Sequence, residues 1–269
     1  MAGGDASKLD GLMSSASVRS LQSWAYRYKR TWRGSAVSSV LQPVLFLAAM
    51  GLGLGSLVNR GHTTSLGGVT YLVFLAPALL AAGAMQTGTM ESTWPVMAAV
   101  KWLKTYDAML ATPLRVRDVL MGHLTWIALR VAMTCTVFLV VMTLFGATKS
   151  PEAVFMIPVG ILTGLAFAAP IAAYAVTLER DGPLTAIFRF GVMPMFLFSG
   201  TFFPVSQLPA AIQPIAYLTP LWHGVDLCRH LSLGTASFWG SIAHVAYLLL
   251  WIVVGTAVAR VTYRRRLVT

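Results

Sequence analysis

The sequence predicts an all-α integral membrane protein with six transmembrane helices. Hydrophobic residues make up 57% of the 269-residue chain and charged residues only 11%, whereas a soluble domain has about 25% charged residues. The apolar residues fall into six segments long enough to cross a bilayer, and the basic residues cluster at the ends of these segments, as the positive-inside rule describes. This placement explains the formal net charge of +11 without nucleic-acid binding.

Two segments precede the first predicted span. Residues 1–17 are small and polar, and we interpret them as a mobile cytoplasmic tail. Residues 18–34 predict an amphipathic helix at the membrane interface, with tryptophans at headgroup depth and cations toward water and anionic lipid. Its apolar face is formed by Leu21, Trp24, Tyr28 and Trp32, and its cations are Arg27, Lys29, Arg30 and Arg33.

The transmembrane region is predicted to cover residues 35–260, followed by a basic cytoplasmic C-terminus at residues 261–269. The spans are expected at residues 35–58, 67–90, 119–145, 153–178, 184–203 and 238–259. With this arrangement, sixteen Lys and Arg residues lie on one side and three on the other. The excess of cations marks the cytoplasmic side, so both termini are predicted to be cytoplasmic. Two GxxxG motifs, at Gly51 and Gly55 and at Gly160 and Gly164, predict close helix approach.

The segment between the second and third spans, residues 91–118, is longer than a simple connection requires. It carries four cations, and its apolar residues recur at near-helical spacing. Two interpretations remain open for this segment. It is either a helix that contacts a separate ATPase or an amphipathic helix lying on the membrane surface.

The segment between the fifth and sixth spans, residues 203–232, combines an apolar composition with Pro204, Pro209, Pro214 and Pro220. This proline spacing prevents one continuous helix, and the composition is too apolar for an exposed loop. Two short re-entrant helices in the outer leaflet satisfy both observations, provided that their interrupted backbone is covered by protein.

Arg130 lies near the middle of the third predicted span. An arginine at the bilayer centre costs about 2.5–3.5 kcal/mol on insertion scales, so it should face protein or water. It either lines a pathway or pairs with a helix-end carbonyl or an acid on a neighbouring span. Gln86, near the inner end of the second span, is the other polar candidate for a pathway.

Several catalytic and cofactor motifs are missing from the sequence. It contains no G-x-x-x-x-G-K-[ST], H-E-x-x-H or G-x-S-x-G motif. Two cysteines and five scattered histidines give neither a disulfide framework nor a metal-ligand spacing. We therefore expect no enzyme activity, no metal and no cofactor in this chain, so that any ATP and Mg²⁺ would be bound by another chain.

Three motifs resemble those of ABC-2 type transporter permeases. The first is the run from Phe198 to Pro204, followed by Gln207-Leu208-Pro209 and by Leu218 to Asp226. The second is the run from Tyr106 to Arg115, and the third is Glu91 at the inner end of the second span. The runs Leu221 to Arg229 and Tyr71 to Pro77 are most similar to nodulation-type lipo-oligosaccharide exporters and daunorubicin-resistance permeases.

This resemblance implies a transport subunit in a bacterial plasma membrane, exporting a glycolipid, a lipo-oligosaccharide or a hydrophobic drug. It implies two ABC ATPase subunits, a second permease that is identical or paralogous, contact with membrane lipid and no nucleic-acid partner. Residues 91–118 then hold the coupling helix, with the candidates Glu91, Trp102, Tyr106, Asp107, Leu110, Thr112 and Pro113. The pathway candidates are Gln86, Arg130, Phe196, Phe198, Phe202 and Phe203, the phenylalanines forming either an outer gate or ordinary packing.

Two other classes of function compete with a permease. An accessory or assembly membrane protein would use residues 91–118 only for docking, but it would have no need for a re-entrant segment. An ion-coupled carrier would need acidic residues in the membrane or inverted repeats, and the sequence offers few of the former and none of the latter.

Overall fold

The computed structural model describes residues 18–26, 28–29, 41, 43–54 and 68–268, and within these ranges every regular element is a helix. The elements are η1 (Ala48–Leu54), α3 (Tyr71–Ser92), α4 (Trp94–Met97), η3 (Ala98–Trp102), α5 (Thr105–Leu110), α6 (Val116–Leu144), η4 (Pro151–Phe155), α7 (Met156–Ala175), α8 (Gly182–Ile187), η5 (Phe188–Val192), α9 (Met193–Phe198), η6 (Val205–Gln207), α10 (Gln213–Tyr217), α11 (Pro220–Leu233) and α12 (Phe238–Leu267).

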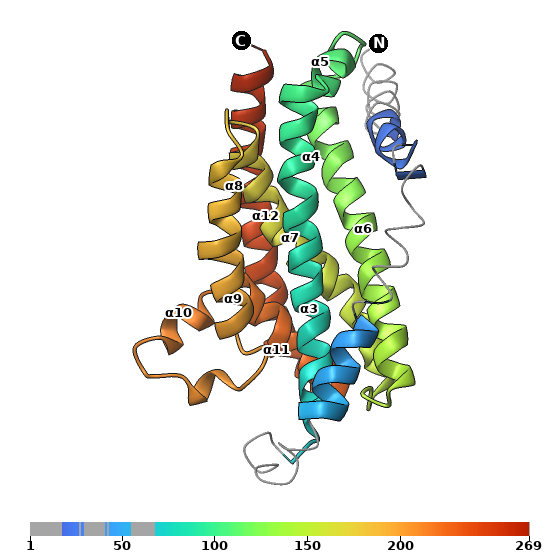
Figure 1. The fold of residues 1–269 in the computed structure, drawn as a ribbon, viewed down its shortest axis with the longest axis vertical. Helices are drawn as coiled ribbons and strands as arrows, with labels where there is room; N and C mark the ends of the chain where they lie inside the picture. The colour runs from blue at the N-terminus through green and yellow to red at the C-terminus, as the bar shows by residue number, and fades with distance from the viewer. Residues whose placement is uncertain (1–17, 27, 30–40, 42, 55–67, 269) are drawn as a thin grey trace, which may run out of the picture.

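The long helices run roughly antiparallel to one another (Figure 1). The helical residues 18–26, helix α5 and the C-terminal end of α12 lie at one end of the bundle. Helix α10 and the α6–α7 connection lie at the opposite end. Following the predicted orientation, we call the first end inner and the second end outer.

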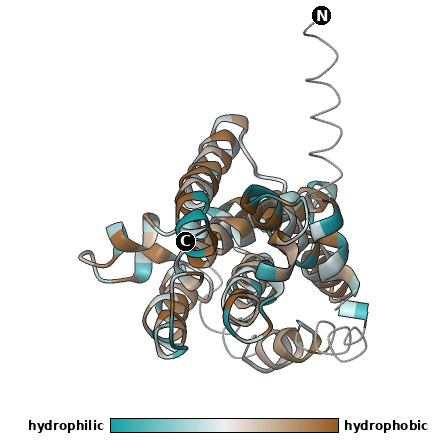
Figure 2. Ribbon diagram, turned by 90° about the horizontal axis from the view of Figure 1, so that it is seen from above, coloured by the Kyte–Doolittle hydropathy of each residue, from teal (hydrophilic) through white to brown (hydrophobic). Residues whose placement is uncertain are grey.

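Four helices are long and apolar enough to cross a membrane: Tyr71–Trp102, Val116–Leu144, Pro151–Ala175 and Phe238–Leu267. Within the most apolar 18 residues of each helix, 78% of the residues are buried in the Tyr71–Trp102 helix and 56% in the α7 helix. The corresponding shares are 33% in α6 and 17% in α12. Helices α3 and α7 therefore form the centre of the bundle, and α6 and α12 present apolar side chains outward. Figure 2, viewed along the bundle, shows hydrophobic residues on the helices around its periphery, and the exposed ones include Val140 of α6 and Val253 of α12.

Glycines allow α3, α6 and α7 to approach one another closely. A Cβ at Gly88 would lie 2.3 Å from the carbonyl oxygen of Gly164, and a Cβ at Gly160 would lie 2.4 Å from Cys135 Sγ. The GxxxG motif of Gly160 and Gly164 is therefore used inside this chain: Gly164 meets the backbone of α3 directly, and Gly160 leaves room for Cys135 of α6. The other GxxxG motif lies partly outside the described residues.

The structure corrects the expectation that residues 91–118 form a segment separate from the second span. The second helix continues past Ser92 through a break at Thr93, so that its apolar stretch extends from Tyr71 to Trp102. The Thr93 hydroxyl donates to the carbonyl oxygen of Thr89 at 3.0 Å, a bond of the kind that often bends helices, and the Met97 backbone N–H donates to the Thr93 carbonyl oxygen at 3.1 Å beyond the break. The chain turns sharply only at Lys104, the one described non-glycine residue with positive φ (45°).

The fifth predicted span is shorter than expected, whereas the last one is longer. Helices α8, η5 and α9 together form an apolar helix over Gly182–Phe198, and Ser199 and Gly200 end it. Helix α12 continues to Leu267, so the basic residues after 260 extend the last helix and do not form a separate tail. The first predicted span lies partly outside the described residues, which contribute residues 43–47 and η1 to it.

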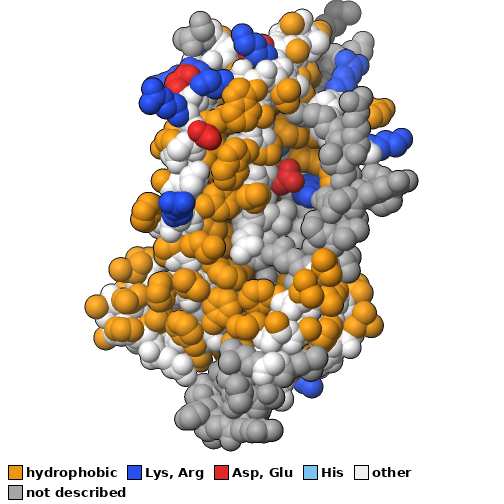
Figure 3. Space-filling model, viewed as in Figure 1, with side chains coloured by type: hydrophobic (Ala, Val, Ile, Leu, Met, Phe, Trp, Pro, Cys, Tyr) orange, Lys and Arg blue, Asp and Glu red, His pale blue; other side chains and the backbone are white. Residues whose placement is uncertain are grey.

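The predicted re-entrant segment folds as a 3-10 turn, the five-residue helix α10 and the fourteen-residue helix α11. Helix α11 is about 21 Å long, so it is too short to span a hydrocarbon core of about 30 Å. It packs against α3, α7 and α12 at the outer end. Figure 3 shows hydrophobic side chains over most of this face of the molecule and Lys and Arg side chains gathered mainly near the inner end.

Candidate functional site

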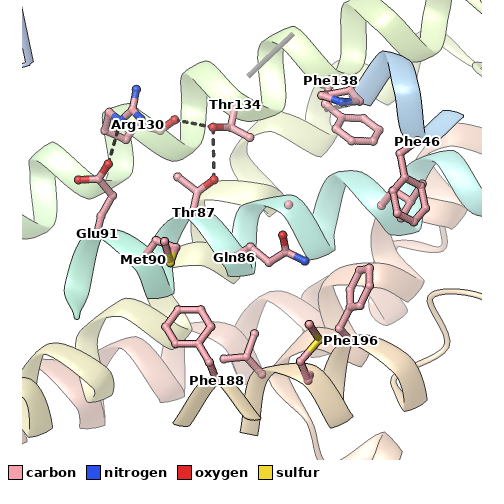
Figure 4. A pocket seen from close by; sticks show the side chains of 15 residues that line it. Phe46, Gln86, Thr87, Met90, Glu91, Arg130, Thr134, Phe138, Phe188 and Phe196 are labelled. Carbon is pink, nitrogen blue, oxygen red and sulfur yellow. Dashed lines mark hydrogen bonds and ion pairs between the residues drawn. The ribbon is translucent and has the colours of Figure 1, made fainter. Parts of the chain in front are cut away.

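A cavity of about 540 Å³ lies between α3, α6 and the η5–α9 helix, beside the helical residues 43–54. Its lining includes Gln86, Glu91, Arg130 and Phe196, which the sequence had suggested for coupling or for a pathway. Figure 4 shows Glu91 and Arg130 of α3 and α6 at one end of the cavity and Phe46, Phe138 and Phe196 at the other, with Phe188 across from Met90. The cavity is therefore amphipathic along its length.

An ion pair forms the polar end. Arg130 Nε on α6 donates to Glu91 Oε1 at the end of α3 over 3.1 Å, and the Trp126 indole Nε1 donates to Glu91 Oε2 over 3.3 Å. The side chains are only 13% exposed for Arg130 and 20% for Glu91, and the guanidinium lies 4.4 Å from the ring centroid of Tyr28. Arg130 thus pairs with an acid of a neighbouring helix, which is one of the two alternatives, and it also lines the cavity. Its place in a transport pathway stays a prediction.

Uncharged polar groups continue the wall from this pair. The Thr87 hydroxyl of α3 lies 3.4 Å from the Thr134 hydroxyl of α6, which itself donates to the carbonyl oxygen of Arg130 at 3.1 Å. Gln86 adds an amide on the same side of the cavity (Figure 4). Together with the neutralised ion pair, these groups offer donors and acceptors without net charge.

Aromatic and apolar side chains line the rest of the cavity, among them Phe46, Phe138, Phe188 and Phe196. Phe196 packs edge to face against Phe202 with ring centroids 5.0 Å apart, and Phe202 lies 6.2 Å from Phe46. Two of the four predicted gate residues are thus in mutual contact. The other two lie elsewhere, because Phe198 is 41% exposed and Phe203 packs on the small outer cluster of Val205, Leu208 and Ala216.

The inner end of the molecule carries the predicted coupling residues. Trp102, Asp107, Thr112 and Pro113 are exposed, and Leu110 is partly exposed. Tyr106 differs from them because it is fully buried. A direct contact between Tyr106 and a partner is therefore excluded while α5 keeps this position, and its predicted role would have to be indirect.

The predicted interface helix is described at residues 18–26 and 28–29, so Arg27, Arg30 and Arg33 lie outside the described residues. Lys29 is exposed. Trp24 is only 5% exposed and stacks on His123 of α6, with ring centroids 4.0 Å apart and planes 2° apart. The ring of Trp24 therefore packs into the bundle and does not face lipid, while its predicted depth at the level of the headgroups stays a prediction.

At the outer end, Arg229 of α11 ties three segments together. Its guanidinium lies 3.8 Å from the ring centroid of Phe74, and it donates to the carbonyl oxygens of Phe74 at 3.3 Å and of Gly200 at 2.8 Å. Gly200 has a φ of 81°, which favours glycine. Arg229 is one of the three Lys and Arg residues predicted on the outer side, and the structure uses it to hold the end of α9 against α3.

A histidine and aspartate cluster joins α11 to α12 nearby. His223 Nδ1 lies 2.9 Å from His244 Nδ1, and His244 Nε2 lies 3.3 Å from Asp226 Oδ2. Within the part of the chain that the structure describes, no group of three or more His, Cys, Asp or Glu side chains has the arrangement needed to hold a metal ion. The cluster therefore acts as a hydrogen-bonded link between the two helices.

Sequence reasoning did not single out several cavity residues, notably Thr87, Thr134, Phe138 and Phe188. One signal was present: Thr87 and Glu91 are four residues apart, as are Arg130 and Thr134, and this spacing places each pair on one helix face. The aromatic residues gave no such signal, because phenylalanines that face lipid and phenylalanines that line a cavity look alike in a span.

Comparison with known proteins identifies the family. The ABC-2 type transporter family matches residues 18–233. Nodulation protein J of Rhizobium leguminosarum bv. viciae is 33% identical over 252 residues, which cover 91% of this chain and 93% of the relative. Nodulation protein J of Rhizobium leguminosarum bv. trifolii is 32% identical over 95% of this chain and 99% of the relative, and that of Rhizobium meliloti is 31% identical over 91% and 92%. This multi-pass membrane protein therefore belongs to the ABC-2 type transporter family.

Proposed function

We propose that this chain is the permease subunit of an ATP-driven exporter for an amphipathic substrate. The observation that carries the proposal is the cavity between α3, α6 and η5–α9, with an ion pair at one end and aromatic side chains at the other. A small-molecule site is commonly a largely apolar cavity with a few polar groups that orient the ligand. This cavity has both features and lies between the helices of a membrane protein.

The cavity favours a substrate with an uncharged polar head and a hydrocarbon portion. Leu79 and Glu91 both line it, and twelve residues of helix separate them by about 18 Å, enough for a head and the first part of a chain. Glu91 already neutralises Arg130, so a phosphate would have to displace a carboxylate that holds two hydrogen bonds. Hydroxyl and amide groups could instead bond to Gln86, Thr87 and Thr134. A glycolipid or lipo-oligosaccharide fits this pattern, and a neutral hydrophobic drug is the second candidate.

The energy is proposed to come from a separate ABC ATPase, present in two copies and binding ATP with Mg²⁺. Family membership supports this proposal, and so does the exposed inner surface formed by α5 and its flanks. That surface contains Trp102, Asp107, Thr112 and Pro113. Motion of the ATPases against it would alter the inner end of α3, where Glu91 closes the cavity.

A second permease, identical or paralogous, would complete the transporter. Helix η5–α9 supports this, because Phe190 is 82% exposed and Met193 is 58% exposed beside the cavity. We further propose six spans with both termini in the cytoplasm of a bacterium. Residues 35–58 and the short helix over Gly182–Phe198 would supply the two spans beyond the four that are long enough.

Purification of the tagged chain from its own host in mild detergent tests this function. We expect an ABC ATPase to co-purify, and reconstituted vesicles containing both proteins should move a co-purifying amphipathic lipid only when ATP is added. An accessory protein would bind without ATP-dependent movement of lipid. An ion-coupled carrier would transport without the ATPase. Either result would overturn the proposal.

A further inference from the structure

His123 lies where four segments of the chain meet at the inner end. Its side chain is fully buried on α6, and its Nδ1 atom lies 3.2 Å from the hydroxyl oxygen of Tyr106 on α5. The face of its ring is covered by Trp24 from the N-terminal helix. Tyr106 in turn packs against Tyr263 of α12, with ring centroids 5.8 Å apart. We call Trp24, Tyr106, His123 and Tyr263 the inner aromatic cluster.

Helix α5 depends on this cluster for its position. It has only six residues, of which Tyr106 and Met109 are buried, and an isolated helix of this length is unstable in water. It also directly follows Lys104, whose left-handed conformation is unfavourable for a side chain with a Cβ. The orientation of α5 is therefore set by what its two buried side chains contact and not by the helix itself.

The contact between Tyr106 and His123 is directional, which distinguishes it from ordinary packing. Phenylalanine and leucine would fill the same space without burying polar atoms, whereas a buried hydroxyl or imidazole must keep a partner. A hydrogen bond between the ends of two side chains also fixes the rotation of α5 about its own axis. That rotation determines whether Asp107 and Ala108 face outward, as they do here.

We propose that His123 is a positioning residue that orients α5 through Tyr106 and transmits movement of α5 to α6, α12 and the N-terminal helix. This inference rests on the proposed function, because it assumes that an ATPase moves α5. Movement of Tyr106 would act on α6 through the hydrogen bond, two helical turns before Arg130 and the cavity. The exposed residues of α5 would provide the binding surface, and the inner aromatic cluster would provide the transmission.

Three substitutions separate transmission from packing. Tyr106→Phe removes only the hydroxyl, and His123→Phe keeps a ring for Trp24 but removes Nδ1. His123→Asn places a polar group near the position of Nδ1 and loses the ring. Tyr71→Phe is the matched control, since Tyr71 is a buried tyrosine, 5% exposed, at the outer end of α3.

The measurement uses a reporter at the outer end. Ile215 on α10 is 65% exposed, and both native cysteines are buried, so Ile215→Cys gives a selective site for a fluorescent maleimide. The labelling rate is measured in the complex with the co-purifying ATPase, with and without a non-hydrolysable ATP analogue. The amount of bound ATPase and the melting temperature are measured in parallel.

We expect the nucleotide-dependent change in labelling rate to fall at least fivefold in Tyr106→Phe and in His123→Phe, with bound ATPase within twofold of the parent. The double variant Tyr106→Phe/His123→Phe should lose no more of this change than either single variant does. His123→Asn should recover part of the change, and Tyr71→Phe should show the change of the parent. A full response in both single variants overturns the inference, as does a parallel loss of ATPase binding and melting temperature. An absent response in the parent complex also overturns it. If the parent chain binds no ATPase at all, the proposed function itself fails.

Discussion

Arg130 on α6 and Glu91 at the inner end of α3 form an ion pair across the mouth of the cavity, with 3.1 Å between Nε and Oε1. The two residues are 39 positions apart in the chain, and the pair satisfies a charge that would otherwise be costly within a span. The pair also joins α3, which leads toward α5, to α6, and both helices line the cavity. The pair therefore lies where movement of α5 could open or close the polar end.

Removing both members of this pair should destabilise the protein less than the sum of the two single removals. Glu91→Gln or Arg130→Gln leaves a largely buried charge without its partner, and we expect a loss of about 1–3 kcal/mol, below the 3–5 kcal/mol typical of a fully buried pair. Glu91→Gln/Arg130→Gln should cost less than the sum of the two. Melting temperatures in detergent would show this order.

The control for these variants is Lys101→Gln, because Lys101 pairs with Glu179 where both side chains are about half exposed. That pair should contribute at most about 1 kcal/mol. If the double variant melts as low as the sum of the single variants predicts, the two residues do not act as a pair.

Gly88 and Gly83 on α3 give a matched test of backbone contact. Alanine at Gly88 would place its Cβ 2.3 Å from the Gly164 carbonyl oxygen, whereas alanine at Gly83 would meet nothing within 4 Å. Gly88→Ala should therefore reduce folded yield and melting temperature, by about 1–3 kcal/mol as for other overpacking substitutions. Gly83→Ala should be neutral or stabilising by up to about 1 kcal/mol, since alanine favours the helix. Equal effects in size-exclusion and melting assays would contradict the close approach of α3 and α7.

The α5 surface should be needed for ATPase binding. Ala108 is exposed at the inner end, and Ala108→Arg adds a long cation there without disturbing the buried residues of the helix. We expect at least a tenfold loss of co-purifying ATPase with unchanged yield of the permease. Ala211→Arg, at an exposed position near α10, is the control and should bind the ATPase normally.

The proposed topology can be tested with single cysteines and an impermeant maleimide. Positions 62, 149 and 210 should label from outside in intact cells, and positions 104, 181 and 265 only after the membrane is opened. The reason is the asymmetry of basic residues between the two ends. One position with the reverse pattern would be incompatible with six spans and cytoplasmic termini.

Acidic pH should weaken the contact between α11 and α12. Burial, together with the nearby His244, lowers the pKa of His223 to about 4 from an ordinary value of 6.5. Because the unfolded chain binds this proton more readily, the contribution of His223 is complete above about pH 6.5 and is lost as the pH falls toward 4. Other groups face this site, namely Asp226, Arg229, His230 and His244, so only part of the pH dependence belongs to His223.

The measurement is the melting temperature at pH 7 and at pH 4.5, for the parent protein and for His223→Gln. The parent should lose more stability at the lower pH than the variant does, because glutamine cannot take up the proton. An identical decrease in both would show that His223 does not titrate in this range.

Much of the helical arrangement could be predicted from hydropathy and charge. Four of the predicted spans correspond to helices that are long and apolar enough to cross a membrane, and the resemblance to ABC-2 permeases is confirmed. The helix ends were less predictable. Charged residues after Met90 suggested that the second span stops there. The same helix in fact continues to Trp102, because hydrogen bonds continue across Thr93.

The site was predictable only in part, because its residues come from different helices. Arg130 was identified because a charge in a span needs an explanation, and Glu91 because of its place in a family motif. The first signal allowed an acidic partner on a neighbouring span, but neither signal indicated that Glu91 would be that partner. Trp24 was identified only as part of the apolar face of the interface helix, and His123 was not singled out. The sequence did not indicate that the two rings would stack, because only the fold brings them face to face.

The two walls of the cavity differ in a way that bears on how such a transporter could evolve. The α3 wall is locked by the backbone contact of Gly88 with Gly164, whereas α9 has no buried residue at all. Substitutions at positions of α9 that line the cavity should therefore cost less folding free energy than substitutions at the Gly88–Gly164 contact. We therefore expect natural diversification toward new cargoes to accumulate on the α9 wall, while the α3 wall preserves the architecture that makes such variation tolerable.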